Sequence, residues 1–436
     1  MFNFLAELLI WGVIGALPGF YAAFIKRYNP LYGLLAGAVV GIIVGMGGTS
    51  IGIVASPGSA IVILLGLAAS AALLLPRDNY MDEKASLRFR INFLAYALTL
   101  PTALIVIGIV VFPLIWNLIF SVRPIRTADL QRVEIFDLSD FTLENYEAQM
   151  GLRVDEVPCV TDDAGECVVD EEGNVEVVSA RRYFDDYRGW REAGTLQLGE
   201  DYYTVGVQNR DFYPMIVRTL FYTLASSFMA ILFGLAAALL VRDAFPGRNV
   251  FRGFLLFPYI APVISVAFVW QVLLRQNGLV NELVDSNTSF LSTNDTFLGI
   301  SIPLIVVILF QTWRYFPFAF LFLLARIQAI PEDMYEAAKV DGATPSQRLF
   351  FITLPQLRAV FGTLFLLRFI WTFNKFDDVF LLTGPISQTK VIPVGIFEAL
   401  FSEANVGEAS AIAVIMAAIL AVILLIYFKF FLVEEA

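Results

Sequence analysis

Residues 335–355 read YEAAKVDGATPSQRLFFITLP and form a polar stretch between long apolar segments. Gly342 stands where a helix would end in a left-handed cap. A second helix start follows at once, because Thr344 is a good N-cap residue and Gln347 completes a capping box. Pro355 is expected to end this second helix. Two helices of about 10 residues are marginal alone in water, so the stretch predicts a docking element that something else holds in place.

Three spaced blocks of this stretch resemble the EAA loop of bacterial ATP-binding-cassette (ABC) importers: Glu336-Ala337-Ala338, Asp341-Gly342-Ala343 and Ile352-Thr353-Leu354-Pro355. From about residue 88 onward the chain resembles the sugar-importer permeases, most closely the larger membrane subunit of maltose-type transporters. In that family the loop forms coupling helices that sit in a cleft of the ATPase subunit, where the glutamate pairs with a basic residue. The competing interpretation is an ordinary amphipathic cytoplasmic loop. The resemblance implies a coupling loop at 331–358 whose contact residues are Glu336, Ala337, Ala338, Asp341, Gly342, Leu354 and Pro355.

The composition is that of an integral membrane protein. The 436 residues are 58% hydrophobic and only 16% charged, whereas a soluble domain carries about 25% charge. The chain has no histidine, which excludes histidine-based triads, metal sites and proton relays. A G-x-x-x-x-G-K-[ST] phosphate loop is also absent from the sequence. We therefore expect no enzymatic activity or cofactor in this chain, and ATP and Mg to be bound by separate ATPase subunits. The acidic cluster at 162–172 could suggest a calcium site, but its spacing does not fit a D-x-D-x-D-G loop, so solvated charge is the preferred interpretation and no metal site is assigned.

Nine apolar segments are each long enough to cross about 30 Å of hydrocarbon: 4–25, 31–53, 57–76, 92–121, 214–241, 250–274, 297–329, 359–383 and 408–432. Lysine and arginine gather in alternate short loops, so the positive-inside rule places the N-terminus outside and the C-terminus in the cytoplasm. The predicted fold is an all-α polytopic protein of the inner membrane with a six-span core. Its predicted parts are three accessory helices at 1–76, a linker and first core span at 77–121, an external domain at 122–213, and the remaining core spans at 214–436.

The predicted external domain is acidic, with 21 acidic and 7 basic residues in 127–211. Short strands are expected at 154–160, 167–170 and 175–179, separated by turn sequences, so the domain is predicted to be small and β-rich. Cys159 and Cys167, the two cysteines of the sequence, fall in one hairpin and are predicted to form a disulfide, with a free buried pair as the alternative. Residues 141–146, FTLENY, resemble the F-x-x-x-N-Y segment of sugar permeases. In maltose-type members an inserted domain at this place touches the solute-binding protein.

Polar side chains inside the last spans predict a cavity. Ionisable groups within a span cost about 2.5–3.5 kcal/mol and indicate function by default. Segment 359–383 contains Arg368, Asn374, Lys375, Asp377 and Asp378. At helical spacing, Lys375 and Asp378 would share one face with Trp371. The competing interpretation is that Lys375 and the two acids simply reach the outer interface.

Two other spans present matching faces. Gln311, Arg314, Tyr315 and Phe318 recur at helical spacing, and the two prolines around Tyr259 predict a kinked or broken helix that borders a cavity. Aromatic rings beside polar donors suit a sugar. Local matching to the maltose-type permease implies sugar contacts in the same three spans. The predicted substrate-binding set is Tyr259, Gln311, Arg314, Tyr315, Phe318, Trp371, Thr372, Lys375 and Asp378.

The sequence therefore predicts the permease subunit of an ATP-driven ABC importer for a sugar of the oligosaccharide or α-glucoside type. Its predicted partners are two ATPase subunits, a second permease subunit in a heterodimer, an external solute-binding protein and the lipid bilayer, with no nucleic acid. Arg314 and Lys375 stand where the maltose-type pattern is mostly neutral, so an anionic solute such as a glycerol phosphate is an alternative. A second alternative is an ion-driven secondary transporter that uses Asp377 and Asp378.

Overall fold

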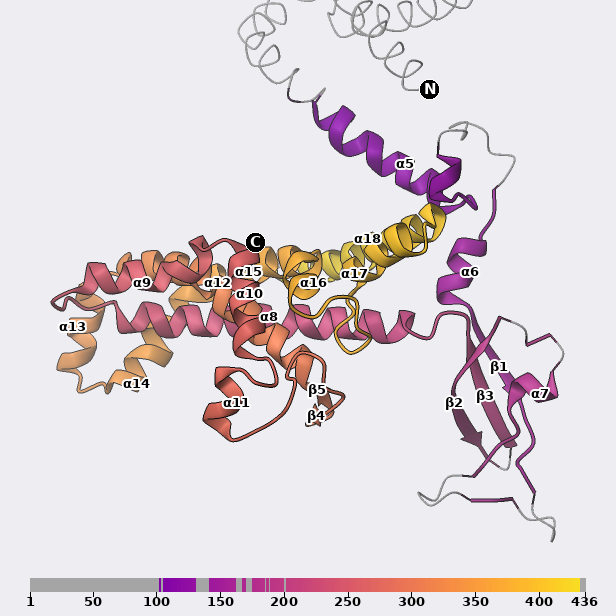
Figure 1. The fold of residues 1–436 in the computed structure, drawn as a ribbon. Helices are drawn as coiled ribbons and strands as arrows, with labels where there is room; N and C mark the ends of the chain where they lie inside the picture. Colours follow the sequence, from indigo (N-terminus) through magenta and orange to yellow (C-terminus); the bar gives the residue numbers. More distant parts are fainter. Residues whose placement is uncertain are drawn as a thin grey trace, which may run out of the picture. The chain divides into compact units, whose positions relative to one another are not determined.

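The computed structural model describes residue 102 and residues 105–130, 141–161, 167–169, 175–184, 186–187, 189–199 and 201–431 (Figure 1). The predicted spans at 4–25, 31–53 and 57–76 lie outside these residues, as does most of the acidic cluster at 162–172. The chain divides into two compact units, one of Met1–Ile115 with Val133–Asp137 and one of Trp116–Arg132 with Leu138–Ala436. In the first unit, the described part is a π-helical turn (Ile107–Val111) that leads into α5 (Phe112–Ser121).

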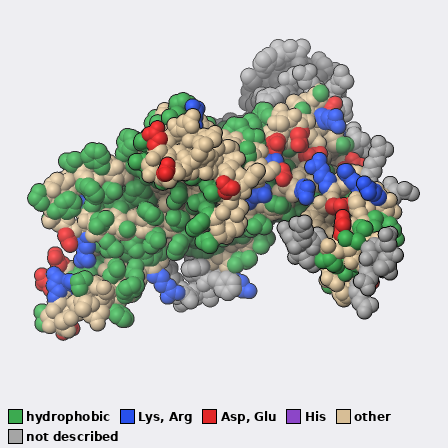
Figure 2. Space-filling model, turned by 60° about the horizontal axis from the view of Figure 1, so that its bottom comes forward, with side chains coloured by type: hydrophobic (Ala, Val, Ile, Leu, Met, Phe, Trp, Pro, Cys, Tyr) green, Lys and Arg blue, Asp and Glu red, His purple; other side chains and the backbone are tan. Residues whose placement is uncertain are grey.

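The second unit contains a bundle of long apolar helices (Figure 1). Four are long and apolar enough to cross a membrane: Phe212–Leu240, Ile302–Gln328, Pro345–Phe373 and Val406–Lys429. A fifth span would combine α9 (Arg248–Ile260) with α10 (Val263–Leu273), which are bent by 91°. Each of these five overlaps one of the last five predicted segments, although the run Pro345–Phe373 shares only residues 359–373 with the segment predicted at 359–383. Hydrophobic side chains cover much of the bundle surface in Figure 2, whereas charged side chains gather toward its ends.

Small residues bring the two central helices together. α8 (Phe212–Leu240) packs along α12 (Ile302–Gln328), and its buried face includes Ser226, Ser227 and Gly234. A Cβ atom on Gly234 would lie 2.7 Å from the Cβ atom of Ala319, so only glycine permits this approach. Close packing of small residues is how membrane helices gain contact without a hydrophobic driving force.

The predicted break near Tyr259 is present. α9 ends at Ile260, and α10 begins after Ala261 and Pro262. Arg314 of α12 donates from Nη1 to the carbonyl oxygen of Ala261 at 3.0 Å. The bend leaves this carbonyl without its helical partner, and the arginine supplies one from another helix.

The polar stretch folds into α13 (Glu332–Val340), α14 (Pro345–Arg348) and η3 (Leu349–Thr353), a π-helical turn that continues into α15 (Leu354–Phe373). The predicted turn at Gly342 is present, with φ +78°. Thr344 and Gln347 form the predicted capping box. The predicted break at Pro355 is wrong, because residues 345–373 form one helical run. The π-helical turn just before Pro355 interrupts the regular hydrogen-bond pattern of the helix, and a residue without an N–H group is accommodated there.

A second correction concerns segment 359–383. α15 ends at Phe373, and α16 (Asp377–Thr383) begins after a short connection. Lys375 therefore lies between two helices, and the common helical face predicted for Trp371, Lys375 and Asp378 does not exist. The chain continues through α17 (Ile392–Phe397) and the π-helical turn η4 (Glu398–Ser402) to α18 (Val406–Phe431).

A three-stranded antiparallel sheet lies at the end of the bundle opposite α13 and α14 (Figure 1). Its order is β1 (Leu152–Glu156), β3 (Asp201–Val207), β2 (Arg191–Leu198), with a bulge between Glu192 and Gly194. One face packs on Val157, Ala180 in α7 (Ala180–Tyr183) and Tyr187. Only β1 overlaps a predicted strand. In place of the other two predicted strands, isolated bridges join Cys159 to Val177, Thr161 to Cys167 and Val169 to Val175. Cys159 and Cys167 are joined by a disulfide.

Helix α6 (Glu144–Met150) is fastened to the segment after α5 by two residues of the FTLENY motif. The buried Asn145 donates from Nδ2 to the carbonyl oxygens of Ser121 at 3.0 Å and Arg123 at 2.8 Å. The Tyr146 hydroxyl donates to Ser121 Oγ at 2.8 Å. Between α10 and α12 lie α11 (Leu279–Val284) and a hairpin of β4 (Thr296–Phe297) and β5 (Ile300–Ser301).

Candidate functional site

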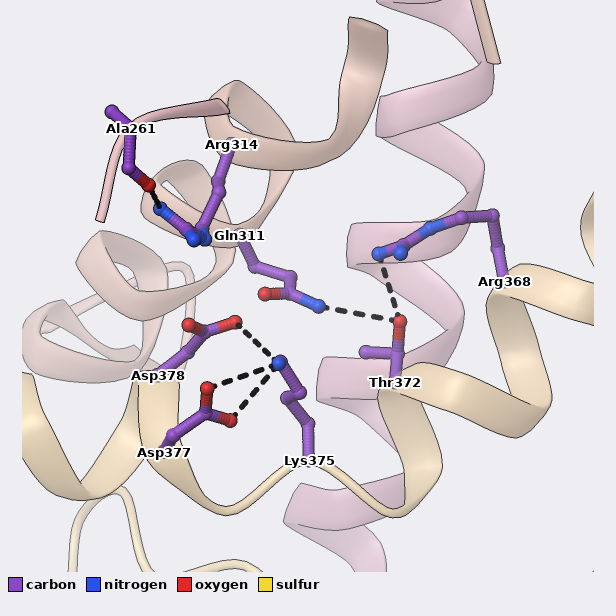
Figure 3. A network of polar contacts seen from close by, with 8 residues as sticks. All are labelled: Ala261, Gln311, Arg314, Arg368, Thr372, Lys375, Asp377 and Asp378. Carbon is purple, nitrogen blue, oxygen red and sulfur yellow. Dashed lines mark hydrogen bonds and ion pairs between the residues drawn. The ribbon is translucent and has the colours of Figure 1, made fainter. Parts of the chain in front are cut away.

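A cluster of buried polar side chains joins α12, α15 and α16 (Figure 3). Gln311, Thr372 and Asp378 are almost wholly enclosed, and Arg368 is 1% exposed. Arg368 Nη2 donates to Thr372 Oγ1 at 3.0 Å, and Gln311 Nε2 lies 3.3 Å from the same oxygen. When the Gln311 amide is turned over, its nitrogen donates to Asp378 and its oxygen accepts from Arg368 at 3.1 Å. That orientation gives Asp378 Oδ2 and Arg368 Nη2 a common partner and links the three helices, while Arg368 Nε and Asp378 Oδ1 have no hydrogen-bond partner among the described residues.

Lys375 brings the second positive charge of the cluster. Its Nζ atom lies 3.0 Å from Asp377 Oδ1 and 3.9 Å from Asp378 Oδ2. The side chain of Asp377 is 39% exposed, whereas that of Asp378 is fully buried. A buried carboxylate is tolerated only with such partners, because its desolvation is costly. We call Gln311, Arg368, Thr372, Lys375 and Asp378 the polar cluster.

Aromatic rings surround the polar cluster. The Tyr315 ring centre lies 4.4 Å from the Arg368 guanidinium and 5.2 Å from Lys375 Nζ, distances at which cation–π attraction acts. Phe318 contacts Trp371 edge-on at 5.1 Å between ring centroids, and Tyr259 lies 6.0 Å from Tyr315. Trp371 remains 46% exposed. The rings and cations therefore form one wall that is open on the side of Trp371.

A pocket of about 270 Å³ opens beside this wall. Four residues of the predicted substrate-binding set line it: Gln311, Tyr315, Trp371 and Lys375. The other lining residues are Arg368, Ile370 and Asn374. Of the remaining predicted residues, Thr372 and Asp378 belong to the polar cluster, Arg314 is bonded to Ala261, and Tyr259 and Phe318 extend the aromatic wall. Arg368 and Asn374 are polar residues of a predicted span but were not in the predicted substrate-binding set. Ile370 is an apolar residue in an apolar span, so nothing in the sequence marks it as a lining residue.

A larger pocket, of about 420 Å³, lies near the sheet end of the bundle. Three of its charged groups form ion pairs with one another: Lys390 Nζ lies 2.9 Å from Asp211 Oδ2 and 2.7 Å from Glu398 Oε2. Burial lowers the pKa of Lys390, but the hydrogen bonds to Glu398 and Asp211 outweigh this and hold the pKa above the ordinary lysine value. Paired charges of this kind fasten α8 to the start of α17 and η4. We therefore place the candidate site at the smaller pocket.

The second candidate region is the segment from α13 to η3, at the opposite end of the bundle from the sheet (Figure 1). Glu336 is exposed, and the apolar side chains of Val340 and Phe351 are 88% and 79% exposed. Of the other predicted coupling residues, Ala337, Asp341, Gly342 and Pro355 are exposed, and Ala338 and Leu354 are half-buried. The capped turn at 341–344 holds these side chains in place although they have little burial of their own.

The long apolar helices, the bent α9–α10 pair and the polar wall define a multi-pass membrane transport protein. The fold resembles that of a bacterial alginate ABC transporter solved in complex with an alginate pentasaccharide-bound periplasmic protein. The TM-score is 0.54 at 18% sequence identity, over 80% of this chain and 96% of that one. Residues 230–433 match the binding-protein-dependent transport system inner membrane component family. The chain belongs to this family, and is thus a permease subunit of an ABC importer.

Individual relatives are similar over about half of this chain. The inner membrane ABC transporter permease protein YcjO of Escherichia coli (strain K12) is 32% identical over 231 residues, which is 52% of this chain and 78% of the relative. The trehalose transport system permease protein SugA of Mycobacterium tuberculosis is 30% identical over 53% of this chain and 73% of the relative. The trehalose/maltose transport system permease protein MalF of Thermococcus litoralis is 31% identical over 50% and 75%.

Proposed function

We propose that this permease translocates a sugar of the oligosaccharide or α-glucoside type, delivered by a solute-binding protein, in an ATP-driven importer. The observation that carries the proposal is the continuous helical run from Pro345 to Phe373. It begins in the exposed segment and ends beside the pocket, where it contributes Arg368 and Trp371. Relatives named for trehalose and maltose support a sugar, as do the aromatic rings and amide groups of the pocket.

In the proposed mechanism, two separate ATPase subunits bind ATP and Mg and move the segment from α13 to η3 when they close. Glu336 would form the ion pair at the docking surface, Gly342 the turn, and α15 would carry the motion to the pocket. The substrate contacts proposed are those predicted from the sequence, together with Arg368, Ile370 and Asn374. A second permease subunit would supply the facing wall of the pocket, beyond the exposed Tyr259 and Trp371.

The proposed topology follows from the cationic end of the bundle. Arg242, Arg248 and Arg252 lie in or beside the α8–α9 connection, and Arg242 contacts Tyr335 of α13. The positive-inside rule assigns this end to the cytoplasm, and the sheet to the external side, where it would meet the solute-binding protein. On this assignment the C-terminus is cytoplasmic. The external N-terminus and the three accessory spans of the nine-span arrangement remain predictions.

The coupling role is tested by Glu336→Arg in proteoliposomes that contain the partner subunits. We expect ATP-driven uptake to be lost, because the reversed charge repels the basic residue expected in the ATPase cleft. The control is Glu282→Arg, an exposed carboxylate of α11 outside both candidate regions, and it should transport normally. Uptake that survives Glu336→Arg, or that proceeds with an inactive ATPase, would contradict the proposal and favour an ion-driven transporter.

The pocket is tested by Trp371→Ala and Lys375→Ala. Both variants should alter uptake without loss of the ATPase subunits, since each removes part of the pocket lining. The control is Leu425→Ala, an exposed apolar residue of α18. Unchanged uptake in both pocket variants would remove this pocket from the transport path.

One observation favours an anionic solute as the second candidate. The lining of the pocket includes Arg368 and Lys375 but no acidic side chain. Competition assays with a neutral disaccharide and with a glycerol phosphate distinguish the two candidates. Inhibition by the glycerol phosphate alone would reject the neutral sugar.

A further inference from the structure

Tyr335 is buried within an otherwise exposed helix. Its side chain is 3% exposed, whereas Glu336 and Val340 of the same helix face outward. Its hydroxyl group lies 2.9 Å from Thr353 Oγ1. Its ring centre lies 3.8 Å from the guanidinium carbon of Arg242, within the range of a cation–π contact.

These contacts join three different parts of the bundle, and we call Arg242, Tyr335 and Thr353 the Tyr335 junction. Arg242 directly follows Val241, the C-cap of α8, and Thr353 ends the π-helical turn that leads into α15. Tyr335 itself lies on α13. A single aromatic side chain therefore connects the exposed helix to two long helices of the bundle.

The two partners of Tyr335 are themselves held in place. Arg248 Nη1 donates to the carbonyl oxygen of Arg242 at 3.3 Å, and Arg252 Nη2 donates to the carbonyl oxygen of Val241 at 3.2 Å. These bonds give partners to two carbonyl groups at the C-terminal end of α8. Thr353 Oγ1 donates to the Arg348 carbonyl oxygen at 3.4 Å across the π-helical turn. Because the hydroxyl proton of Thr353 is used in this bond, Thr353 Oγ1 accepts the hydrogen bond from the Tyr335 hydroxyl group. π-Helical turns interrupt regular helices and are frequent at functional positions.

We infer that Tyr335 is a positioning residue that transmits displacement of α13 to both α8 and α15. This inference rests on the proposed function, because it requires α13 to be displaced by an ATPase subunit. α15 is covalently continuous with the polar segment. α8 is linked to α13 by the side-chain contacts of the Tyr335 junction. α8 packs along α12, which carries Gln311 and Tyr315 of the pocket. α12 and α15 are joined to the exposed segment directly through the chain, so Tyr335 adds α8, which packs along α12, to the helices that move with α13.

The test compares Tyr335→Phe and Thr353→Val, which each remove one side of the same hydrogen bond. The measurement is the amount of solute transported for each ATP hydrolysed, in proteoliposomes with the partner subunits. We expect the ratio of solute transported to ATP hydrolysed to fall by about 2- to 10-fold. This is the change in an equilibrium constant that the loss of one hydrogen bond produces. The double variant should fall no further, because both changes remove one interaction. Arg242→Gln should also lower the ratio, and Arg242→Lys should restore part of it because the cation remains.

The matched control is Tyr213→Phe. Tyr213 donates from its hydroxyl to the carbonyl oxygen of Met150 at 2.6 Å, at the sheet end of the bundle, and the change should leave the ratio unaltered. An unchanged ratio in both Tyr335→Phe and Thr353→Val would overturn the inference. Loss of ATPase association in Tyr335→Phe would also overturn it, since Tyr335 would then belong to the docking surface. Failure of ATP to drive uptake by the wild-type protein would instead reject the proposed function.

Discussion

The polar cluster and the segment from α13 to η3 are both rich in charge, but they find their partners in different places. Arg368 and Asp378 are enclosed and find their partners in Gln311, Thr372 and Lys375 of the same chain. Glu336 is exposed beside apolar side chains, Val340 and Phe351, that the bundle does not cover. Charge that a chain buries must be compensated by its own side chains, whereas charge that it leaves exposed is available to another molecule.

Because of this difference, the buried charges should contribute mainly to stability and the exposed charges mainly to function. Breaking a buried charge pair leaves an uncompensated charge in a medium of low dielectric constant, so the folded state is destabilised. Reversing an exposed charge leaves the folded state nearly unchanged. Substitutions of the buried charges should therefore change the free energy of unfolding, whereas charge reversals in the exposed segment should change coupling with little effect on that free energy.

The largest effect is expected for Asp378→Ala. The change leaves Lys375 and Arg368 without their buried carboxylate and should cost about 3–5 kcal/mol. Unfolding of the purified protein in detergent, followed by denaturant titration, measures the loss. Asp377→Ala is the control, because the side chain of Asp377 is 39% exposed and its ion pair is worth about 1 kcal/mol or less. Equal losses in the two variants would contradict the distinction between buried and exposed charge.

A smaller effect is expected for Lys390→Met, which removes hydrogen bonds to Asp211 and Glu398. Charge-assisted hydrogen bonds contribute about 1.5–3 kcal/mol. The folded-state pKa of Lys390 is raised above its unfolded value of about 10.4. The stabilisation is therefore complete below that pH and is lost as the pH rises through the folded-state pKa. Above about pH 10.4 the wild type should lose stability with rising pH more steeply than the variant, and parallel pH profiles would exclude this role for Lys390.

Thr344→Ala tests how the exposed segment keeps its shape. Thr344 Oγ1 accepts from the backbone N–H of Gln347 at 3.3 Å, and Gln347 Oε1 accepts from the backbone N–H of Thr344 at 2.7 Å. Loss of this cap should cost about 1 kcal/mol and speed hydrogen exchange of the amides of α14. Ser346→Ala, in the same helix but outside the capping box, should have little effect. Unchanged exchange in Thr344→Ala would mean that other contacts order the segment.

The smallest effect on stability is expected for Glu336→Arg. Because Glu336 is exposed, its replacement should change the free energy of unfolding by no more than about 0.5 kcal/mol, although ATP-driven uptake is lost. Denaturant titration of this variant beside Asp378→Ala completes the comparison. A destabilisation as large as that of Asp378→Ala would show that Glu336 has a structural role.

Local signals predicted local structure well. The capping box at Thr344, the positive φ of Gly342 and the break after Ile260 depend on neighbours a few residues away, so each was readable in the sequence. Helix limits were less readable. Pro355 is compatible with both the end of one helix and the first turn of the next, and only the continuous run from Pro345 to Phe373 decides between them. β2 and β3 were missed because the strand pairing that stabilises them is not a local property.

The sequence by itself determined the membrane class, the EAA-type segment with its caps, and the presence of charge in the last spans, because composition, spacing and backbone preference do not depend on tertiary contacts. Only the tertiary structure decided which of those charges meet. It placed Arg368 at the pocket, enclosed Asp378 behind Lys375 and Gln311, and buried Tyr335 between Arg242 and Thr353. Apart from Lys375, which lies three residues before Asp378, the partners come from distant parts of the chain, and their distances follow from helix packing and not from separation along the chain.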